Sequence, residues 1–206
     1  MRGLYAITDS DNLSTQELLP VTEEILRAGV AALQYRDKSG NHDKRRYEAD
    51  RLRELCGEHN CLFIINDDVQ LAKETGSDGV HLGRDDCDCK TARDELGEDV
   101  IIGVSCYDRL EAAQDAVADG ADYVAFGSFY PTESKQKTAT AEPEIIIRAK
   151  ERMSVPIVAI GGITPANCRV LVESGADLLA VISSIYRADD PYSTVKEFNR
   201  LMDVVK

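Results

Sequence analysis

The chain has 206 residues, of which 43% are apolar and 30% charged, a composition typical of one globular domain. Its 24 basic and 37 acidic side chains give a formal net charge of -13, which argues against nucleic acids and anionic membranes as partners. No apolar run approaches the roughly 18 residues that a membrane-spanning helix needs. We therefore expect a cytoplasmic protein whose 6 cysteines remain reduced.

Eight short apolar runs predict eight β-strands along the chain. The runs are almost continuous in apolar residues, which is typical of parallel strands buried on both faces of a sheet. The predicted strands are Leu4–Thr8, Ala32–Tyr35, Leu62–Ile65, Gly79–Leu82, Ile101–Val104, Tyr123–Gly127, Ile157–Ile160 and Leu178–Ile182.

Helical patterns with start signals lie between most of these strands. In chain order the signals are the capping box of Ser14 and Glu17, short patterns over 67–76 and 91–97, Asp108 with Glu111, Glu142-Pro143, and Thr164-Pro165. Four helical patterns are followed by a glycine and then a strand, and these glycines are Gly29, Gly76, Gly120 and Gly175. Such a glycine predicts a left-handed helix end.

The alternation of strands and helices predicts an α/β fold, a closed single-domain (β/α)8 TIM barrel. An open, doubly wound sheet is the structural alternative. In its dinucleotide-binding version that sheet has a GxGxxG turn after the first strand, where this chain has Asp9-Ser10-Asp11-Asn12. We favour the barrel and expect its functional residues at the carboxyl ends of the strands.

Two acidic residues follow neighbouring predicted strands, Asp67 after the third and Asp86 after the fourth. Neighbouring parallel strands lie about 4.8 Å apart, so the two carboxylates are candidates to hold one Mg²⁺ ion. Acid–base work on a sugar is the alternative for such a pair. A structural role is the simpler alternative, because Asp67 could cap the next helix. Asp68 and Asp85 are rival candidates for the metal ligands, since each is a sequence neighbour of one of the pair.

Cations and glycines at other strand ends favour phosphate as the ligand. Arg36 and Lys38 follow the second strand, and Lys135 lies in the long connection after the sixth, although an ordinary surface loop also carries lysines. Gly161-Gly162 and Ser183-Ser184 follow the last two strands, where many barrels bind phosphate through backbone N–H groups. The pattern predicts two anion sites, and the sequence has no Walker loop, GxSxG or HExxH motif.

Eight segments, in order and spacing, resemble the thiamine-phosphate synthase family over almost the whole chain. They are LYAITD (4–9), QYRDK (34–38), IIND (64–67), SDGVHLGRDD (77–86), IIGVS (101–105), ADYVAFGSFYPTESK (121–135), IVAIGGIT (157–164) and AVISSIY (180–186).

The resemblance implies a transferase with one catalytic domain over residues 1–206 and small molecules as its partners. Such an enzyme joins 4-amino-2-methyl-5-(diphosphooxymethyl)pyrimidine to 4-methyl-5-(2-phosphooxyethyl)thiazole, or to its carboxylated form, and releases pyrophosphate. Because the pyrimidine amino group stabilises a cation, the diphosphate departs first with the help of Mg²⁺, and the thiazole nitrogen then attacks. The oligomeric state is left open, with a homo-oligomer as one option.

The resemblance also implies a role for each site residue. The groups that bind the pyrimidine diphosphate are Gln34, Tyr35, Arg36, Asp37, Lys38, Asn66, Ser105 and Lys135, with Arg36, Ser105 and Lys135 as the catalytic ones. The Mg²⁺ ligands are Asp67 and Asp86, and the thiazole phosphate groups are Thr132, Glu133, Ser134, Gly162, Ile182 and Ser183.

The chain departs from the family pattern at three places. Tyr35 stands where Leu is frequent, Arg84 where Gln is frequent, and Thr132-Glu133-Ser134-Lys135 where the family has Thr-Pro-Thr-Lys. Glu133 thereby adds a negative charge near the predicted thiazole phosphate.

Other functions compete with the synthase. The nearest is a thiazole tautomerase, which lacks the diphosphate-binding groups. A non-catalytic thiazole phosphate-binding protein and an acidic interaction protein are the others. If the synthase assignment is right, we predict that Lys135→Ala and Asp67→Ala each lower turnover about 10²–10³-fold while the fold survives.

Overall fold

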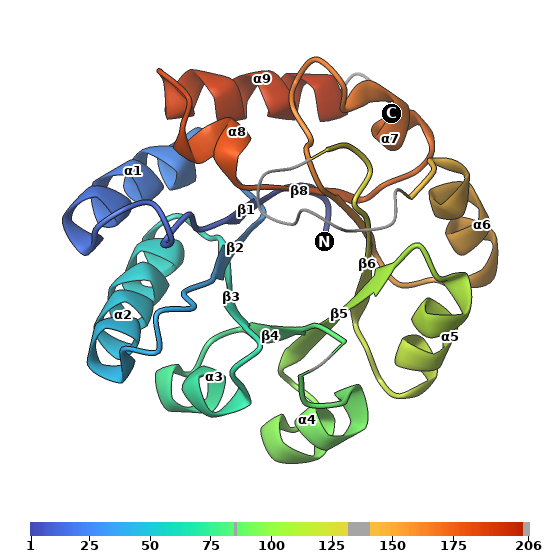
Figure 1. Cartoon of the computed structure of the whole chain (residues 1–206), viewed down its shortest axis with the longest axis horizontal. Helices are drawn as coiled ribbons and strands as arrows, with labels where there is room; N and C mark the ends of the chain where they lie inside the picture. Colours follow the sequence, from blue (N-terminus) through green and yellow to red (C-terminus); the bar gives the residue numbers. More distant parts are fainter. Residues whose placement is uncertain (85, 132–140, 204–206) are drawn as a thin grey trace.

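The computed structural model describes residues 1–84, 86–131 and 141–203, and its strands form a closed parallel barrel (Figure 1). The strands follow one another around the barrel in chain order, and β1 pairs with both β2 and β8 to close it. They are β1 (Gly3–Ile7), β2 (Ala32–Tyr35), β3 (Leu62–Asn66), β4 (Gly79–Leu82), β5 (Ile101–Tyr107), β6 (Tyr123–Phe126), β7 (Ile157–Ile160) and β8 (Leu178–Val181). The predicted TIM barrel is confirmed, and the open sheet is excluded.

The helices lie around the outside of the barrel (Figure 1). They are α1 (Thr15–Ala28), α2 (His42–Glu58), α3 (Val69–Thr75), α4 (Cys89–Leu96), α5 (Leu110–Ala118), α6 (Glu144–Arg152), α7 (Arg169–Glu173), α8 (Ser183–Tyr186) and α9 (Pro191–Asp203). The predicted left-handed helix end is confirmed at Gly76, and the other three glycines, Gly29, Gly120 and Gly175, share a positive φ.

The predicted strands agree with the observed ones except at their ends. β1 lies one residue earlier than predicted, β6 and β8 each end one residue earlier, and β3 ends one residue later. β5 continues to Tyr107, past an irregular register between Ser105 and Tyr107. Such an irregularity changes the direction of a side chain at the end of a strand, and Ser105 lies there.

The predicted helix starts agree with the structure at some positions and differ at others. The capping box is confirmed, because the Ser14 N–H donates to Glu17 Oε2 at 2.9 Å. α6 begins at Glu144, one residue after Pro143. α5 begins two residues after Asp108, because β5 extends to Tyr107 and places Asp108 in the turn.

The predicted start at Thr164-Pro165 is wrong, since α7 begins only at Arg169. The side chain of Asn167 accepts a hydrogen bond from the Thr164 N–H at 2.8 Å and donates one to the Gly162 carbonyl at 3.0 Å. Asn167 thereby stabilises a turn before the helix and ties it to the glycine pair after β7.

Two apolar cores hold the barrel together. Because side chains alternate along a strand, Tyr5 and Ile7 of β1 point into the barrel, whereas Leu4 and Ala6 pack against the helices. The interior core also includes Tyr123 of β6, and it leaves the carboxyl ends of the strands open for polar side chains.

The cysteines agree with the expected reduced state. All six are free thiols, and only Cys87 is not buried. Burial raises the pKa of Cys89 to about 11 and that of Cys106 to about 12, so these two thiols are protonated and unreactive at neutral pH. Over the described ranges, none of the helices combines the length and apolar character needed to cross a bilayer.

Candidate active site

A cavity opens at the carboxyl ends of the strands and, with its open mouth, measures about 1100 Å³. It is lined by side chains from both halves of the barrel and by backbone after β7 and β8. The candidate site residues that line it are Gln34, Arg36, Asn66, Ser105, Gly162, Ile182 and Ser183. The structure therefore brings together residues from positions 34 to 183, as the barrel prediction requires.

A chain of hydrogen bonds crosses the barrel beneath this cavity. Gln34 Nε2 donates to Tyr5 Oη at 2.9 Å, and Tyr5 Oη shares a hydrogen bond with Tyr123 Oη at 2.8 Å. His81 joins Tyr123 Oη to Ser105 Oγ, with both distances 2.9 Å. Burial raises the pKa of both tyrosines, so their hydroxyls stay protonated and remain donors. This network fixes Gln34 and Ser105 on opposite sides of the cavity floor.

Sequence reasoning missed two members of this network. Tyr5 and Tyr123 lie within apolar runs and look like ordinary core residues. The alternation of side chains along β1 and β6 predicts that both tyrosines point into the barrel. It does not predict that their hydroxyl groups meet. His81 forms hydrogen bonds at both ring nitrogens, an arrangement typical of a structural histidine.

Asp67 and Asp86 lie next to each other at the rim beside the cavity. Burial and the neighbouring Asp67 carboxyl raise the pKa of Asp86, against the opposing effects of the Gly83 N–H and the Lys38 ammonium. The Gly83 N–H donates to Asp86 Oδ2 at 2.8 Å, and Lys38 Nζ is paired with the Asp67 carboxylate. The expectation that these two carboxylates converge is therefore confirmed.

Asp68, the competitor of Asp67, has a structural role. It is the N-cap of α3, where its Oδ1 accepts a hydrogen bond from the Leu71 N–H at 2.9 Å, and its Oδ2 pairs with Arg45 at 2.9 Å. Asp67 has a φ of 63°, a left-handed conformation that turns the chain between β3 and the helix. This turn separates the two neighbouring carboxylates.

The donor set at the rim suits a magnesium ion. Two adjacent carboxylates oppose each other's ionisation, and a divalent cation removes that repulsion. Among the described residues, no group of three or more Asp, Glu, His or Cys side chains gathers to hold a metal. The pair matches the habit of Mg²⁺, which takes one or two carboxylates and fills its other positions with water and substrate phosphate.

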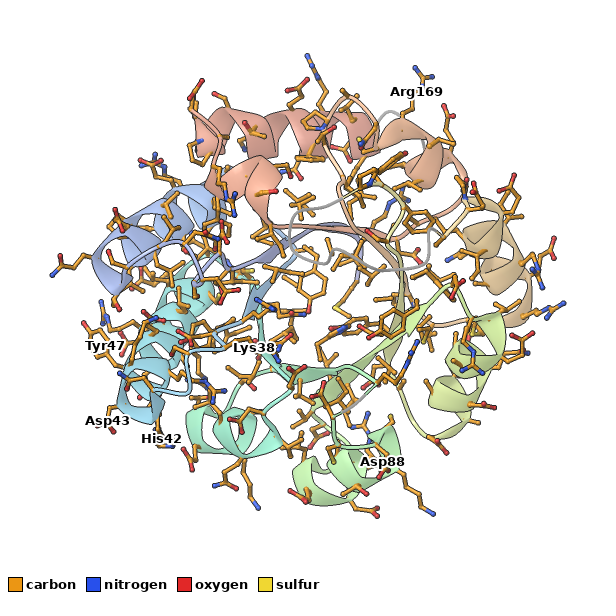
Figure 2. The ribbon with its side chains drawn as sticks, in the orientation of Figure 1. Lys38, His42, Asp43, Tyr47, Asp88 and Arg169 are labelled. Carbon is orange, nitrogen blue, oxygen red and sulfur yellow. The ribbon has the colours of Figure 1, made fainter. Side chains whose placement is uncertain are left out.

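The segment 34–38 divides between the cavity and the helix layer. Gln34 and Arg36 line the cavity, and Arg36 Nη1 pairs with Asp11 at 2.8 Å. Lys38 lies at the inner edge of the ring of helices, whereas Tyr47 of α2 lies outside (Figure 2). Arg36 and Lys38, two of the three cations predicted to bind the diphosphate, thus lie at the mouth of the barrel.

Tyr35 and Asp37, which are also predicted to bind the diphosphate, direct their side chains toward the helix layer. Tyr35 Oη donates to Glu48 Oε2 of α2 at 2.7 Å, and Asp37 Oδ2 pairs with Lys44 at 2.7 Å. Both side chains are buried on the helix side, because alternate residues of an extended chain point in opposite directions. A backbone contact of these two residues with substrate stays a prediction.

The opposite side of the cavity offers backbone rather than charge. Gly162 has a φ of 63°, and a Cβ there would lie 2.4 Å from the Pro131 carbonyl oxygen, so only glycine fits. Ser183 is the first residue of α8, and its N–H precedes the hydrogen bonds that Ile185 and Tyr186 donate to the Ile182 carbonyl. The predictions for Thr132, Glu133, Ser134 and Lys135 lie outside the described residues.

Arg84, which departs from the family pattern, lies near the metal candidates. Its guanidinium lies 4.4 Å from the centre of the Tyr107 ring, a cation–π contact at the end of β5. Tyr107 also lines the cavity. Arg84 therefore packs against the wall of the cavity without lining it.

Comparison with known proteins agrees with this geometry. A family model described as thiamine monophosphate synthase matches residues 4–185. The chain is 47% identical to the thiamine-phosphate synthase of Thiobacillus denitrificans, over 97% of this chain and 94% of the relative. It is 48% identical to that of Chromobacterium violaceum, over 92% and 91%. A solved thiamine phosphate pyrophosphorylase from Pyrococcus furiosus has a TM-score of 0.88 and 33% identity, with coverage of 98% and 96%.

Proposed function

This chain belongs to the thiamine monophosphate synthase family, and we propose that it couples a pyrimidine diphosphate to a thiazole phosphate. It is an enzyme of the transferase class, like the relatives it matches. The proposed substrates are 4-amino-2-methyl-5-(diphosphooxymethyl)pyrimidine and 4-methyl-5-(2-phosphooxyethyl)thiazole, with pyrophosphate as the second product.

One observation supports this proposal: two surfaces of different chemistry, each suited to an anion, lie on opposite sides of the cavity. Arg36 and Lys38 offer cations on the β2 side, beside the carboxylates of Asp67 and Asp86. Gly162 and the start of α8 offer backbone N–H groups on the other side. A charged surface suits a diphosphate with its metal, and a backbone surface suits a single phosphate.

The proposed chemistry needs no nucleophile from the protein. The bond between the pyrimidine methylene and the diphosphate breaks first, because the amino group of the ring donates electrons to the resulting cation. Arg36, Lys38 and Lys135 stabilise the departing diphosphate, and the hydrogen-bonded Ser105 orients the pyrimidine from the cavity floor. The thiazole nitrogen then attacks the methylene carbon with its own lone pair, while Gly162 and Ser183 hold its phosphate.

Asp67 and Asp86 are the residues that would hold Mg²⁺ in this proposal. Their adjacency and the raised pKa of Asp86 support it, since two crowded carboxylates favour a divalent cation. A bound Mg²⁺ would neutralise part of the charge that builds up on the departing diphosphate. Lys38, which pairs with Asp67 in the structure, would be available to contact the diphosphate if a metal ion replaced it at that carboxylate.

We further propose a cytoplasmic location and a single catalytic domain over residues 1–206, with a homo-oligomer as one option for its assembly. The carboxylated thiazole phosphate is the alternative acceptor, and a thiazole tautomerase or a non-catalytic phosphate-binding protein is the alternative function.

Pyrophosphate release distinguishes these functions. We expect the protein to release pyrophosphate only when both substrates and Mg²⁺ are present, and to stop when EDTA removes the metal. The measurement is a coupled phosphate assay after pyrophosphatase treatment, with each substrate omitted in turn. A tautomerase would instead change the thiazole carboxylate without pyrophosphate release, and a binding protein would show neither reaction.

A further inference from the structure

A buried polar cluster lies behind the loop that carries Arg36 and Lys38. Its central residue is Glu48 of α2, whose side chain has an exposure of 0%. Glu48 Oε2 accepts the hydrogen bond of Tyr35 Oη at 2.7 Å, Oε1 accepts from Thr15 Oγ1, and Lys44 Nζ lies 3.8 Å from Oε1. Three elements thus meet here: the start of α1, the end of β2, and α2.

Lys44 connects this cluster to the loop itself. Its Nζ lies 2.7 Å from Asp37 Oδ2, and Asp37 Oδ1 accepts from the Ser39 N–H at 2.6 Å. The Asp37 side chain is 1% exposed. The hydrogen bonds from Lys44 and Ser39 lower the pKa of Asp37 despite its burial, which acts to raise it. Two buried carboxylates therefore share one lysine.

Stability alone does not account for such a cluster. Fully buried acidic residues are rare, and a buried ion pair is often no more stabilising than apolar side chains of the same size. A buried polar cluster has directional bonds that an apolar contact lacks, and so it fixes orientation.

The orientation that it fixes is that of the two rim cations. Asp37 stands between Arg36 and Lys38, and its side chain is held on the helix side, so its neighbours face the barrel mouth. Thr8 holds the same loop from the other side, since the Arg36 N–H donates to Thr8 Oγ1 at 2.9 Å. The loop is therefore fastened on both faces.

We propose that Glu48 and Lys44 are positioning residues for the diphosphate site, which act through Tyr35 and Asp37 to hold Arg36 and Lys38 toward the ligand. This inference rests on the proposed function for the identity of the ligand. Neither α2 residue lines the cavity, so neither is expected to touch substrate.

The negative charge of Glu48 allows a positioning role to be distinguished from a purely electrostatic effect on anion binding. If Glu48 acted only through its negative charge, its removal would strengthen the binding of an anion. If it positions the two cations, its removal weakens that binding. Glu48→Met removes the charge and the hydrogen bonds at similar volume, so the sign of the change decides between the two.

The experiment measures magnesium pyrophosphate binding by calorimetry and the KM of each substrate. For Glu48→Met and Lys44→Met we expect a roughly 10- to 100-fold weaker Kd for pyrophosphate and a similar rise in the KM of the pyrimidine diphosphate. The KM of the thiazole phosphate should stay within about twofold, because its site lies across the cavity. A purely structural role would change both KM values together.

Lys150→Met is the matched control, because Lys150 Nζ pairs with Asp177 at 2.9 Å away from the cavity. We expect it to leave pyrophosphate binding and both KM values unchanged. If Glu48→Met does not fold, Tyr35→Phe removes a single hydroxyl from the same cluster and should weaken pyrophosphate binding in the same direction.

Unchanged or tighter pyrophosphate binding in these cluster variants would overturn the inference. An equal loss in Lys150→Met would overturn it as well. A wild-type protein that binds magnesium pyrophosphate but never releases it from the two substrates would overturn the proposed function instead, so the two failures are distinguishable.

Discussion

Asp67→Asn is expected to lower kcat/KM for the pyrimidine diphosphate about 10²–10³-fold with little change in thermal stability. Asp67 supplies one of the two adjacent carboxylates at the rim, and Asn keeps its shape but not its charge. Asp67→Asn is preferable to the Asp67→Ala variant of the sequence analysis, because Asp67 has a φ of 63° and Asn tolerates this conformation. Steady-state kinetics and a thermal melt provide the two measurements.

Asp68→Ala is the matched control, and its expected effect is the reverse. It removes the N-cap of α3 and the partner of Arg45, so the free energy of unfolding should fall by about 0.5–2 kcal/mol while kcat/KM changes little. If Asp67→Asn retained full activity, or if both variants lost activity equally, the assignment of Asp67 to the metal would be wrong.

Arg36→Met is expected to lower kcat/KM by a similar factor, about 10²–10³-fold. Arg36 lines the cavity, and Thr8 fixes its backbone there. A guanidinium grips two phosphate oxygens at once, so Arg36→Lys should recover only part of the loss. The measurement is steady-state kinetics with saturating thiazole phosphate. The ratio of kcat/KM between Arg36→Lys and Arg36→Met reports how much of the effect depends on the planar guanidinium.

Asp11→Asn controls for the ion pair that Arg36 makes in the structure. Asp11 is exposed and holds Arg36 at 2.8 Å, in competition with the diphosphate. Its removal should leave kcat/KM unchanged or raise it slightly. A loss as large as that of Arg36→Met would show that the ion pair matters, and not the contact of Arg36 with the ligand.

The barrel could be predicted from sequence because its signals are local. Apolar runs of four or five residues mark the parallel strands, and glycines such as Gly76 mark the helix ends that precede them. The start of α7 could not be predicted, because it depends on the bonds that the Asn167 side chain makes with Thr164 and Gly162. A cap motif such as Thr164-Pro165 favours a helix start, but a turn stabilised by side-chain hydrogen bonds can delay it.

The candidate site could be predicted as a set of residues but not as directions of side chains. Asp67 and Asp68 are neighbours in sequence, and only the left-handed turn at Asp67 decides which of them faces the rim. Alternation along β2 and the segment that follows it directs Tyr35 and Asp37 away from the cavity, but their partners Glu48 and Lys44 meet them only when α2 packs against β2.

The floor of the cavity depends on contacts between residues that lie even farther apart in the sequence. Tyr5 and Tyr123 share a hydrogen bond although 118 residues separate them. No local pattern reports such a contact. Only barrel closure, through the pairing of β1 with β8, brings these two hydroxyls together.

We propose that Asp67, Asp86, Arg36 and Lys38 form one binding surface for a metal-bound diphosphate. A crystal structure of the protein grown with magnesium and pyrophosphate would show this surface occupied. We expect a metal ion held by both carboxylates, with the pyrophosphate against Arg36 and Lys38. Pyrophosphate bound only at Gly162 and Ser183, or a metal bound away from both carboxylates, would contradict it.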